Sequence, residues 1–187
     1  DERRIWAGWA RPAAKFTTLY ALYANALKDR DGALAARCEA AARASVRYDG
    51  VEGRHDAEAL EWRTWGHLEL WRYSRDEADK AAAVAALQAL LDLQVTDYVG
   101  GQSETRGFFR SEPDSDAFHH KHIGASYLVW VIAEMIDAFP RHPDAGRWRD
   151  ALSMWADDYA LVFAARNPFG LLPYSLYVEP PADKPHH

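Results

Sequence analysis

The sequence predicts an all-α fold built as an array of α-helical hairpins. Apolar residues recur at spacings of three and four through most of the 187 residues, which is the period of an amphipathic helix. Glycine, proline and aspartate divide the chain into six such stretches. The connections at 29–32, 75 and 139–143 are short, whereas those at 49–55 and 97–116 are long. Short connections join antiparallel neighbours, so the pattern predicts three consecutive hairpins.

The first hairpin is expected from helices at 12–28 and 33–48. Pro12 suits the first turn of a helix, because the N–H that proline lacks would have no partner there. The second helix is rich in alanine, the residue with the highest helix propensity. The large apolar residues of the first helix form one stripe, made by Phe16, Leu19, Tyr20, Tyr23 and Leu27.

The other two hairpins follow from helix start and stop signals. Asp56, Asp76 and Asp144 are good N-cap residues, because their carboxylates accept hydrogen bonds from free N–H groups of the first turn. Pro140 ends a helix, since it cannot continue the helical hydrogen bonding. The predicted helices span about 56–74, 76–96, 117–138 and 144–165.

The last segment, 167–187, is predicted to be non-helical because proline and glycine are dense there. We expect residues 1–187 to form a single α/α-hairpin domain. Three hairpins make half of an (α/α)6 toroid, and half a toroid leaves the apolar faces of its inner helices uncovered. The expected protein partner is therefore the missing half of the toroid or a second copy in a homo-oligomer.

Charge and composition exclude several classes of partner. The net charge of −6 argues against a nucleic-acid partner, which requires a basic face to neutralise phosphates. It also argues against a polybasic membrane surface, and no apolar run is long enough to span a bilayer. The single cysteine, Cys38, cannot form an internal disulfide. No cofactor is expected.

The segment 104–122 is the richest in groups that carry chemistry. Long loops that combine charged and aromatic residues are often functional. Hydrolysis of a glycoside uses two carboxyl groups on either side of the scissile bond, and this segment offers several. An alternative is a solvated loop with an Asp N-cap for the next helix. The catalytic candidates are Glu104, Glu112, Asp114 and Asp116.

Aromatic, basic and histidine side chains are the candidates for substrate binding. Aromatic rings can stack on sugars, and histidine and arginine can bind hydroxyl or carboxylate groups, although packing in a core is the alternative for the aromatic residues. A metal site is not expected, because no Glu-x-x-His or His-x-x-x-His pattern is present. The binding candidates are Trp65, Arg106, Phe108, Phe109, Arg110, His119, His122 and Tyr174.

Three stretches resemble glycoside hydrolase family 9 and, more broadly, the six-hairpin glycosidases. Asn167-Pro168-Phe169-Gly170 is similar to that family's Asn-Pro-x-Gly turn. Glu179-Pro180-Pro181 followed by Pro185-His186-His187 is similar to its Glu-x-Pro-Pro-x-x-Pro-His-His run. The alanine-rich helix 33–44 resembles a helix of the family. The resemblance implies an (α/α)6 barrel that cleaves β-linked glucosides by inversion, with His186 in contact with the substrate.

The chain also departs from that family's pattern. The catalytic base of the family lies in an Asp-Ala-Gly-Asp motif, which is absent from this sequence, and the catalytic acid follows the His-His run, where this sequence has ended. We therefore expect a glycoside hydrolase acting on an oligo- or polysaccharide, with an acid/base pair not fully contained in this chain. A secreted or periplasmic location would suit that activity.

Three alternatives stay open. A sugar epimerase or a uronate polysaccharide lyase can occupy the same toroid, because one fold supports several chemistries. A non-catalytic helical binding module would need no carboxylate pair. His186 and His187 can also be read as the remnant of an affinity tag.

Overall fold

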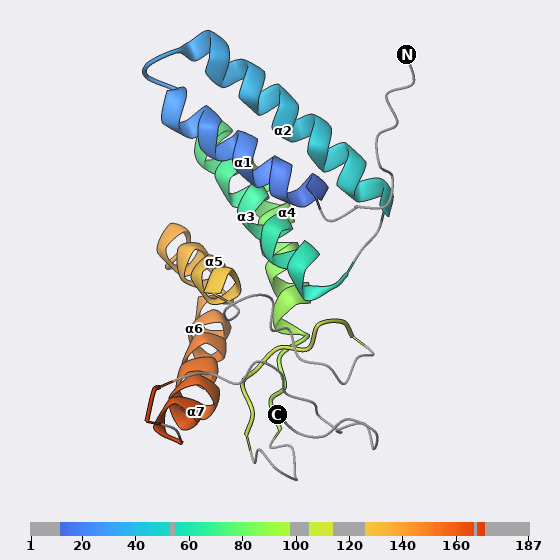
Figure 1. Ribbon diagram of the computed structural model, residues 1–187. Helices are drawn as coiled ribbons and strands as arrows, with labels where there is room; N and C mark the ends of the chain where they lie inside the picture. Colours follow the sequence, from blue (N-terminus) through green and yellow to red (C-terminus); the bar gives the residue numbers. More distant parts are fainter. Residues whose placement is uncertain (1–11, 53–54, 98–104, 114–125, 167, 171–187) are drawn as a thin grey trace. The chain divides into compact units, whose positions relative to one another are not determined.

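The computed structural model describes residues 12–52, 55–97, 105–113, 126–166 and 168–170. The described part is all-α and confirms the predicted hairpin array. The described residues form no β-strand, and they include an isolated antiparallel bridge between Gln94 and Phe109. The helices, in chain order, are α1 (Pro12–Leu27), α2 (Gly32–Glu52), α3 (Ala57–Ser74), α4 (Glu77–Leu91), α5 (Ser126–Ala138), α6 (Ala145–Met154), the π-helical segment η1 (Trp155–Ala160) and α7 (Leu161–Ala165) (Figure 1).

Contacts within the chain divide it into two compact units. The first comprises residues 1–54 and 59–86, which include α1, α2, most of α3 and the first ten residues of α4. The second comprises residues 55–58 and 87–187, which include the end of α4 and all later helices.

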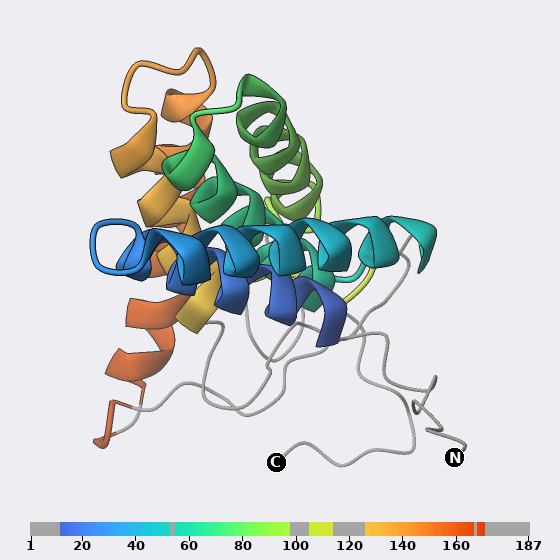
Figure 2. The same ribbon diagram turned by 90° about the horizontal axis from the view of Figure 1, so that it is seen from above.

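The first unit begins with an antiparallel hairpin of α1 and α2, which lie side by side in both views (Figures 1 and 2). The turn closes where the N–H groups of Arg30 and Asp31 donate to the carbonyl oxygen of Leu27, at 2.9 and 2.8 Å. The carboxylate of Asp31 then accepts a hydrogen bond from the N–H of Leu34, at 3.0 Å. Asp31 therefore satisfies a donor that the first turn of a helix leaves free.

Helix α1 packs through its small residues rather than its large ones. Its buried positions are Ala13, Ala14, Thr17, Thr18, Ala21 and Ala24. Small side chains allow a close approach to α3, where the hydroxyl of Thr18 donates to the carbonyl oxygen of Trp62 at 2.9 Å. A Cβ atom on Gly66 of α3 would stand 2.8 Å from the Thr17 methyl carbon. The predicted period of the helix is present, but Phe16, Leu19 and Tyr23 lie on its exposed side.

The second hairpin turns sharply between α3 and α4. Arg75 adopts a left-handed backbone conformation, with φ of 61°, and its guanidinium lies 4.4 Å from the centre of the Trp71 ring. The Asp76 carboxylate accepts a hydrogen bond from the N–H of Ala78 at 2.9 Å, so Asp76 caps α4 as its sequence position predicts. Helix α4 ends at Leu91, earlier than the expected 96, because Val95 pairs with the segment around Phe108.

In the second unit, the segment 105–110 runs beside residues 93–95. The N–H of Val95 donates to the carbonyl oxygen of Phe108 at 2.8 Å, and the N–H of Gly107 donates to that of Val95 at 2.7 Å. The side-chain amide of Gln94 donates to the carbonyl oxygens of Gly107 and Ala151, both at 2.9 Å. These bonds attach the segment to α6.

Helices α5 and α6 form the third hairpin, and α6 continues through η1 into α7. Trp148 of α6 is fully buried and stacks on the His142 ring, with the ring centres 4.8 Å apart. The expected helix 117–138 is described only from Ser126, so its first part lies outside the described residues.

The close approach of Gly107 to α6 predicts a sensitive position. Gly107 has φ of +90°, and a Cβ atom there would stand 2.3 Å from the carbonyl oxygen of Met154. We expect Gly107→Ala to lower the free energy of unfolding by about 2–4 kcal/mol, because both backbone strain and a clash with the main chain result. Urea denaturation measures the change.

Gly146→Ala is the matched control. Gly146 has ordinary backbone angles, and nothing lies within 4 Å of the position its Cβ would take. Because alanine favours helix, this variant should be neutral or up to about 1 kcal/mol more stable. Equal effects of the two variants would contradict the described packing of Gly107.

Candidate functional site

The predicted loop residues that the structure describes are anchored in the second unit. Phe108 and Phe109 are each 1% exposed, and Phe108 packs with Val95 and Tyr159 in an apolar cluster. The ring centres of Phe108 and Tyr159 are 6.0 Å apart. Burial raises the pKa of the Tyr159 phenol, which stays neutral. The two Phe rings therefore contribute to the core in this conformation.

The two predicted arginines and the one described catalytic candidate differ in their surroundings. Arg106 donates from Nε to the Asp158 carboxylate at 2.7 Å, so its charge is paired inside the unit. Arg110 is half-buried, and its N–H donates to the carbonyl oxygen of Leu93. Glu112 is exposed. The other predicted site residues, Glu104, Asp114, Asp116, His119, His122, Tyr174 and His186, lie outside the described residues.

Trp65, the remaining predicted site residue, lies in the first unit on α3. It is 7% exposed and stacks on the half-buried Trp62, with ring centres 5.5 Å apart and planes 16° from parallel. The ammonium group of Lys15 lies 5.5 Å from the centre of the Trp62 ring. The pair thus forms a double layer of indoles, with Trp65 inside and Trp62 nearer to solvent.

A buried carboxylate, Glu69, adjoins this tryptophan pair. Its Oε1 accepts hydrogen bonds from the Trp65 indole at 3.3 Å and from Arg72 at 2.6 Å. Its Oε2 accepts a hydrogen bond from the side-chain amide of Asn25 at 3.0 Å. The same amide also donates to the backbone carbonyl of Glu69 at 2.8 Å, which ties α1 to α3. Every oxygen of this carboxylate therefore has a donor.

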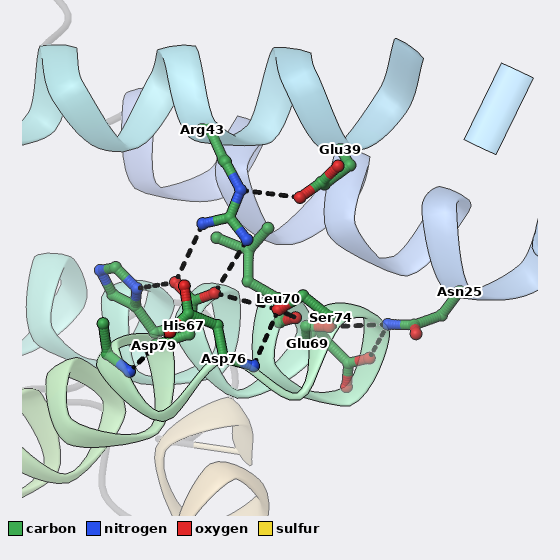
Figure 3. Close-up of polar contacts among 10 residues, drawn as sticks. Asn25, Glu39, Arg43, His67, Glu69, Leu70, Ser74, Asp76 and Asp79 are labelled. Carbon is green, nitrogen blue, oxygen red and sulfur yellow. Dashed lines mark hydrogen bonds and ion pairs between the residues drawn. The ribbon is translucent and has the colours of Figure 1, made fainter. Parts of the chain in front are cut away.

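A second buried carboxylate, Asp79, joins three helices (Figure 3). Arg43 of α2 donates from Nη2 to Asp79 Oδ2 at 3.1 Å and from Nη1 to Oδ1 at 3.4 Å. The Arg43 Nε donates to Glu39 at 2.7 Å. From α3, the Ser74 hydroxyl lies 3.4 Å from Asp79 Oδ2, and His67 Nδ1 lies 3.5 Å from Oδ1. A single carboxylate on α4 thus contacts groups from both preceding helices.

The surroundings of Asp79 keep it ionised. Burial alone would raise the pKa of the Asp79 carboxyl, but the nearby His67 ring and the hydrogen bonds and positive charge of Arg43 outweigh burial and lower it. Burial alone would also lower the pKa of Arg43, but Glu39 and Asp79 raise it above its ordinary value. A general acid needs a raised carboxyl pKa, so Asp79 is suited to an ion pair and not to proton donation.

Sequence reasoning missed these two carboxylates. Glu69 lies between Leu68 and Leu70, both fully buried, so its position within an apolar run was an available signal of an inward-facing acid. Asp79 carries a weaker signal, because acids are common in the first turn of a helix for reasons of capping and dipole.

The described residues include no cluster of three or more histidine, cysteine or acidic groups arranged to hold a metal ion. Among the described helices, none combines the length and the apolar character that crossing a membrane requires.

Comparison of the chain with models of known protein families, with curated proteins and with solved structures gave no match.

The lowered pKa of Asp79 predicts a dependence of stability on pH. A carboxyl whose pKa is depressed in the folded state stabilises the fold above its unfolded pKa, and this contribution is lost as the pH falls through the folded pKa. Asp79→Asn should lower the free energy of unfolding at pH 7 by about 1–3 kcal/mol. The difference from wild type should begin to shrink as the pH falls below the ordinary carboxyl pKa of about 3.9, and should be lost at the lower pH where the folded state also protonates Asp79.

Urea denaturation between neutral and acidic pH measures this difference, and Glu77→Gln is the control. Glu77 is exposed and pairs with Lys80 on the surface, so its loss should change stability little. If the wild type and Asp79→Asn differ by the same amount at every pH, the ionised form of Asp79 is not the source of the effect.

Proposed function

We propose that this chain forms part of a carbohydrate-active enzyme that hydrolyses glycosidic bonds in an oligo- or polysaccharide. The observation that carries the proposal is the stacked Trp62–Trp65 pair on α3 in an all-α hairpin array. The resemblance of the Asn167–Gly170 and Glu179–His187 stretches to glycoside hydrolase family 9 supports the same class. In this proposal the hairpins belong to an (α/α)6 toroid.

The tryptophan pair supplies the binding half of the function. The flat face of an indole suits the C–H face of a pyranose, and a second ring behind it holds the first in a fixed orientation. Trp62 is partly accessible, whereas Trp65 is buried behind it. The ammonium group of Lys15 lies over the Trp62 ring, so in this proposal its flexible side chain moves aside when a sugar stacks there and then donates to the sugar hydroxyls.

The catalytic half requires two carboxyl groups that the described ion pairs do not occupy. Glu69 and Asp79 are poor candidates for acid or base, because the described hydrogen bonds from Asn25, Arg72 and Arg43 already occupy their carboxylate oxygens. We assign this chain's contribution to that pair to the segment predicted from sequence, with Glu104, Glu112, Asp114 and Asp116 as the candidates, while the pair as a whole is not fully contained in this chain. An inverting reaction would place a water molecule between base and sugar, with the carboxyl groups roughly 6.5–9.5 Å apart.

A neutral glycan is favoured over a uronate. Recognition of a uronate carboxylate calls for a free arginine, whose planar guanidinium makes two parallel hydrogen bonds. Arg106, one of the two arginines predicted for substrate binding, is already paired with Asp158. A glycan without charge needs stacking and hydroxyl contacts instead, which the tryptophan pair can supply. A secreted or periplasmic location suits such a substrate.

A non-catalytic helical binding module is the second candidate. The observation that favours it is that two of the described buried carboxylates already serve ion pairs, Asp79 with Arg43 of α2 and Glu69 with Arg72 of its own helix. This module would bind a sugar at Trp62 without cleaving it.

The binding half predicts that Trp62→Ala weakens the affinity for a neutral β-linked oligosaccharide by about tenfold or more, because the stacking surface is lost. Isothermal titration calorimetry with cello-oligosaccharides of increasing length measures the affinity. Trp130→Ala is the matched control, since Trp130 is an exposed tryptophan of α5 in the other unit. Equal affinity of both variants and the wild type would show that Trp62 does not bind the sugar.

The catalytic half predicts release of new reducing ends from a β-linked glucan, with inversion at the anomeric carbon. Proton NMR of the first product detects the anomer directly. Single substitutions of the candidates should show which of them acts as acid or base, because loss of either group lowers the rate by about a hundredfold or more. The variants are Glu112→Gln, Asp114→Asn and Asp116→Asn. Sugar binding without hydrolysis by the wild type would favour the binding module over the hydrolase.

A further inference from the structure

Helix α1 carries a large apolar face that the described structure leaves uncovered. Phe16, Leu19 and Tyr23 are 46%, 44% and 50% exposed, and their spacing of three and four places them on one side of the helix. The opposite side is already buried through alanine and threonine. A helix that is apolar on both sides is normally covered on both sides.

This face carries no formal charge. Lys15 is the sole charged residue within Pro12–Leu27, and its ammonium group is directed over the ring of Trp62 on α3. A partner recognised through acidic or basic groups would find no complement here. A membrane surface is also disfavoured, because helices that lie on membranes carry lysine or arginine along their polar face.

The order of the exposed side chains suits pairing with an identical face. Leu19 lies near the middle, with the aromatic Phe16 three residues before it and the aromatic Tyr23 four residues after it. When two copies of such a helix pair antiparallel about a two-fold axis, Leu19 meets the partner's Leu19 at the axis, and Phe16 meets the partner's Tyr23. An uncharged face avoids the like-charge repulsion that a two-fold axis creates at its centre.

We propose that α1 is a self-association surface, through which two copies of this chain form an antiparallel dimer along Phe16, Leu19 and Tyr23. The Phe16 ring stacks on Tyr20, with ring centres 6.1 Å apart, which fixes one end of the surface before association. Three large side chains on one helix make a small interface, so the dimer is reversible and forms in the micromolar range.

Sedimentation equilibrium of the full chain at several concentrations tests the proposal. Leu19→Glu places two like charges at the two-fold axis and should raise the dimer dissociation constant by about tenfold or more. Leu161→Glu is the control, because Leu161 of α7 is even more exposed but lies on the other unit. That variant should dimerise like the wild type. Circular dichroism verifies that all variants keep the same helical content.

A second experiment keeps the test independent of charge. Leu19→Cys in a Cys38→Ser background should give a covalent dimer with a short bis-maleimide, because Leu19 meets its own copy at the axis. A third experiment uses opposite charges: the doubly substituted Phe16→Glu, Tyr23→Lys chain should dimerise more tightly than either single variant, since each Glu would face the partner's Lys.

Several outcomes would overturn the proposal. A wild type that stays monomeric at high micromolar concentration would do so. A dimer that Leu19→Glu leaves intact would place the interface elsewhere, and equal loss in Leu161→Glu would point to general destabilisation. Cross-linking of Leu19→Cys without rescue by the paired charges would exclude the antiparallel arrangement.

Discussion

The arrangement of the first unit depends on the requirement that a buried carboxylate be paired. Asp79 is 5% exposed, and a lone charge at such a position would cost several kcal/mol. That requirement is met jointly by three side chains, Arg43 of α2 and His67 and Ser74 of α3. Because these partners come from two helices, α2 cannot slide along α3 and α4 without leaving the carboxylate unpaired. A purely apolar contact between alanine-rich helices would permit such sliding far more easily.

Glu69 places a similar restraint on the other side of the unit. The side-chain amide of Asn25 donates both to the carboxylate and to the backbone carbonyl of Glu69, so it fixes the position of α1 along α3. The helices also meet through an apolar cluster of Ala21, Ala42 and Leu70. Alanine buries little area, so polar contacts with defined partners carry much of the specificity of packing in this unit.

The sequence was sufficient for the class of fold, because helical period and helix-breaking residues are local signals. The period could not decide which side of α1 faces inward: a stripe of Phe16, Leu19 and Tyr23 and a stripe of alanine and threonine both repeat at helical spacing. The alanine and threonine stripe faces inward because α1 approaches α3 closely at Gly66, where large side chains would not fit. The early end of α4 could not be predicted from local sequence signals either, because it depends on pairing between Val95 and Phe108.

The candidate site was less predictable than the fold. Trp65 was predicted as a site residue, but its hydrogen-bond partner Glu69 was not considered, since a hydrogen bond between i and i+4 side chains has no sequence signature of its own. Phe108 and Phe109 looked like residues of a functional loop because their neighbours are polar. Their burial follows from residues far along the chain, such as Tyr159, and no local pattern reports such contacts.

The π-helical segment Trp155–Ala160 has a consequence for how this chain should be aligned with others. A π turn contains an extra residue compared with an α turn, so it acts as a one-residue insertion that the helix absorbs without a loop. Leu161–Ala165 is therefore rotated by roughly 100° relative to an uninterrupted continuation of α6. A homologue without the insertion would lack one residue here while keeping the same helix ends. An alignment based on helical period should accordingly allow a single-residue gap after Met154.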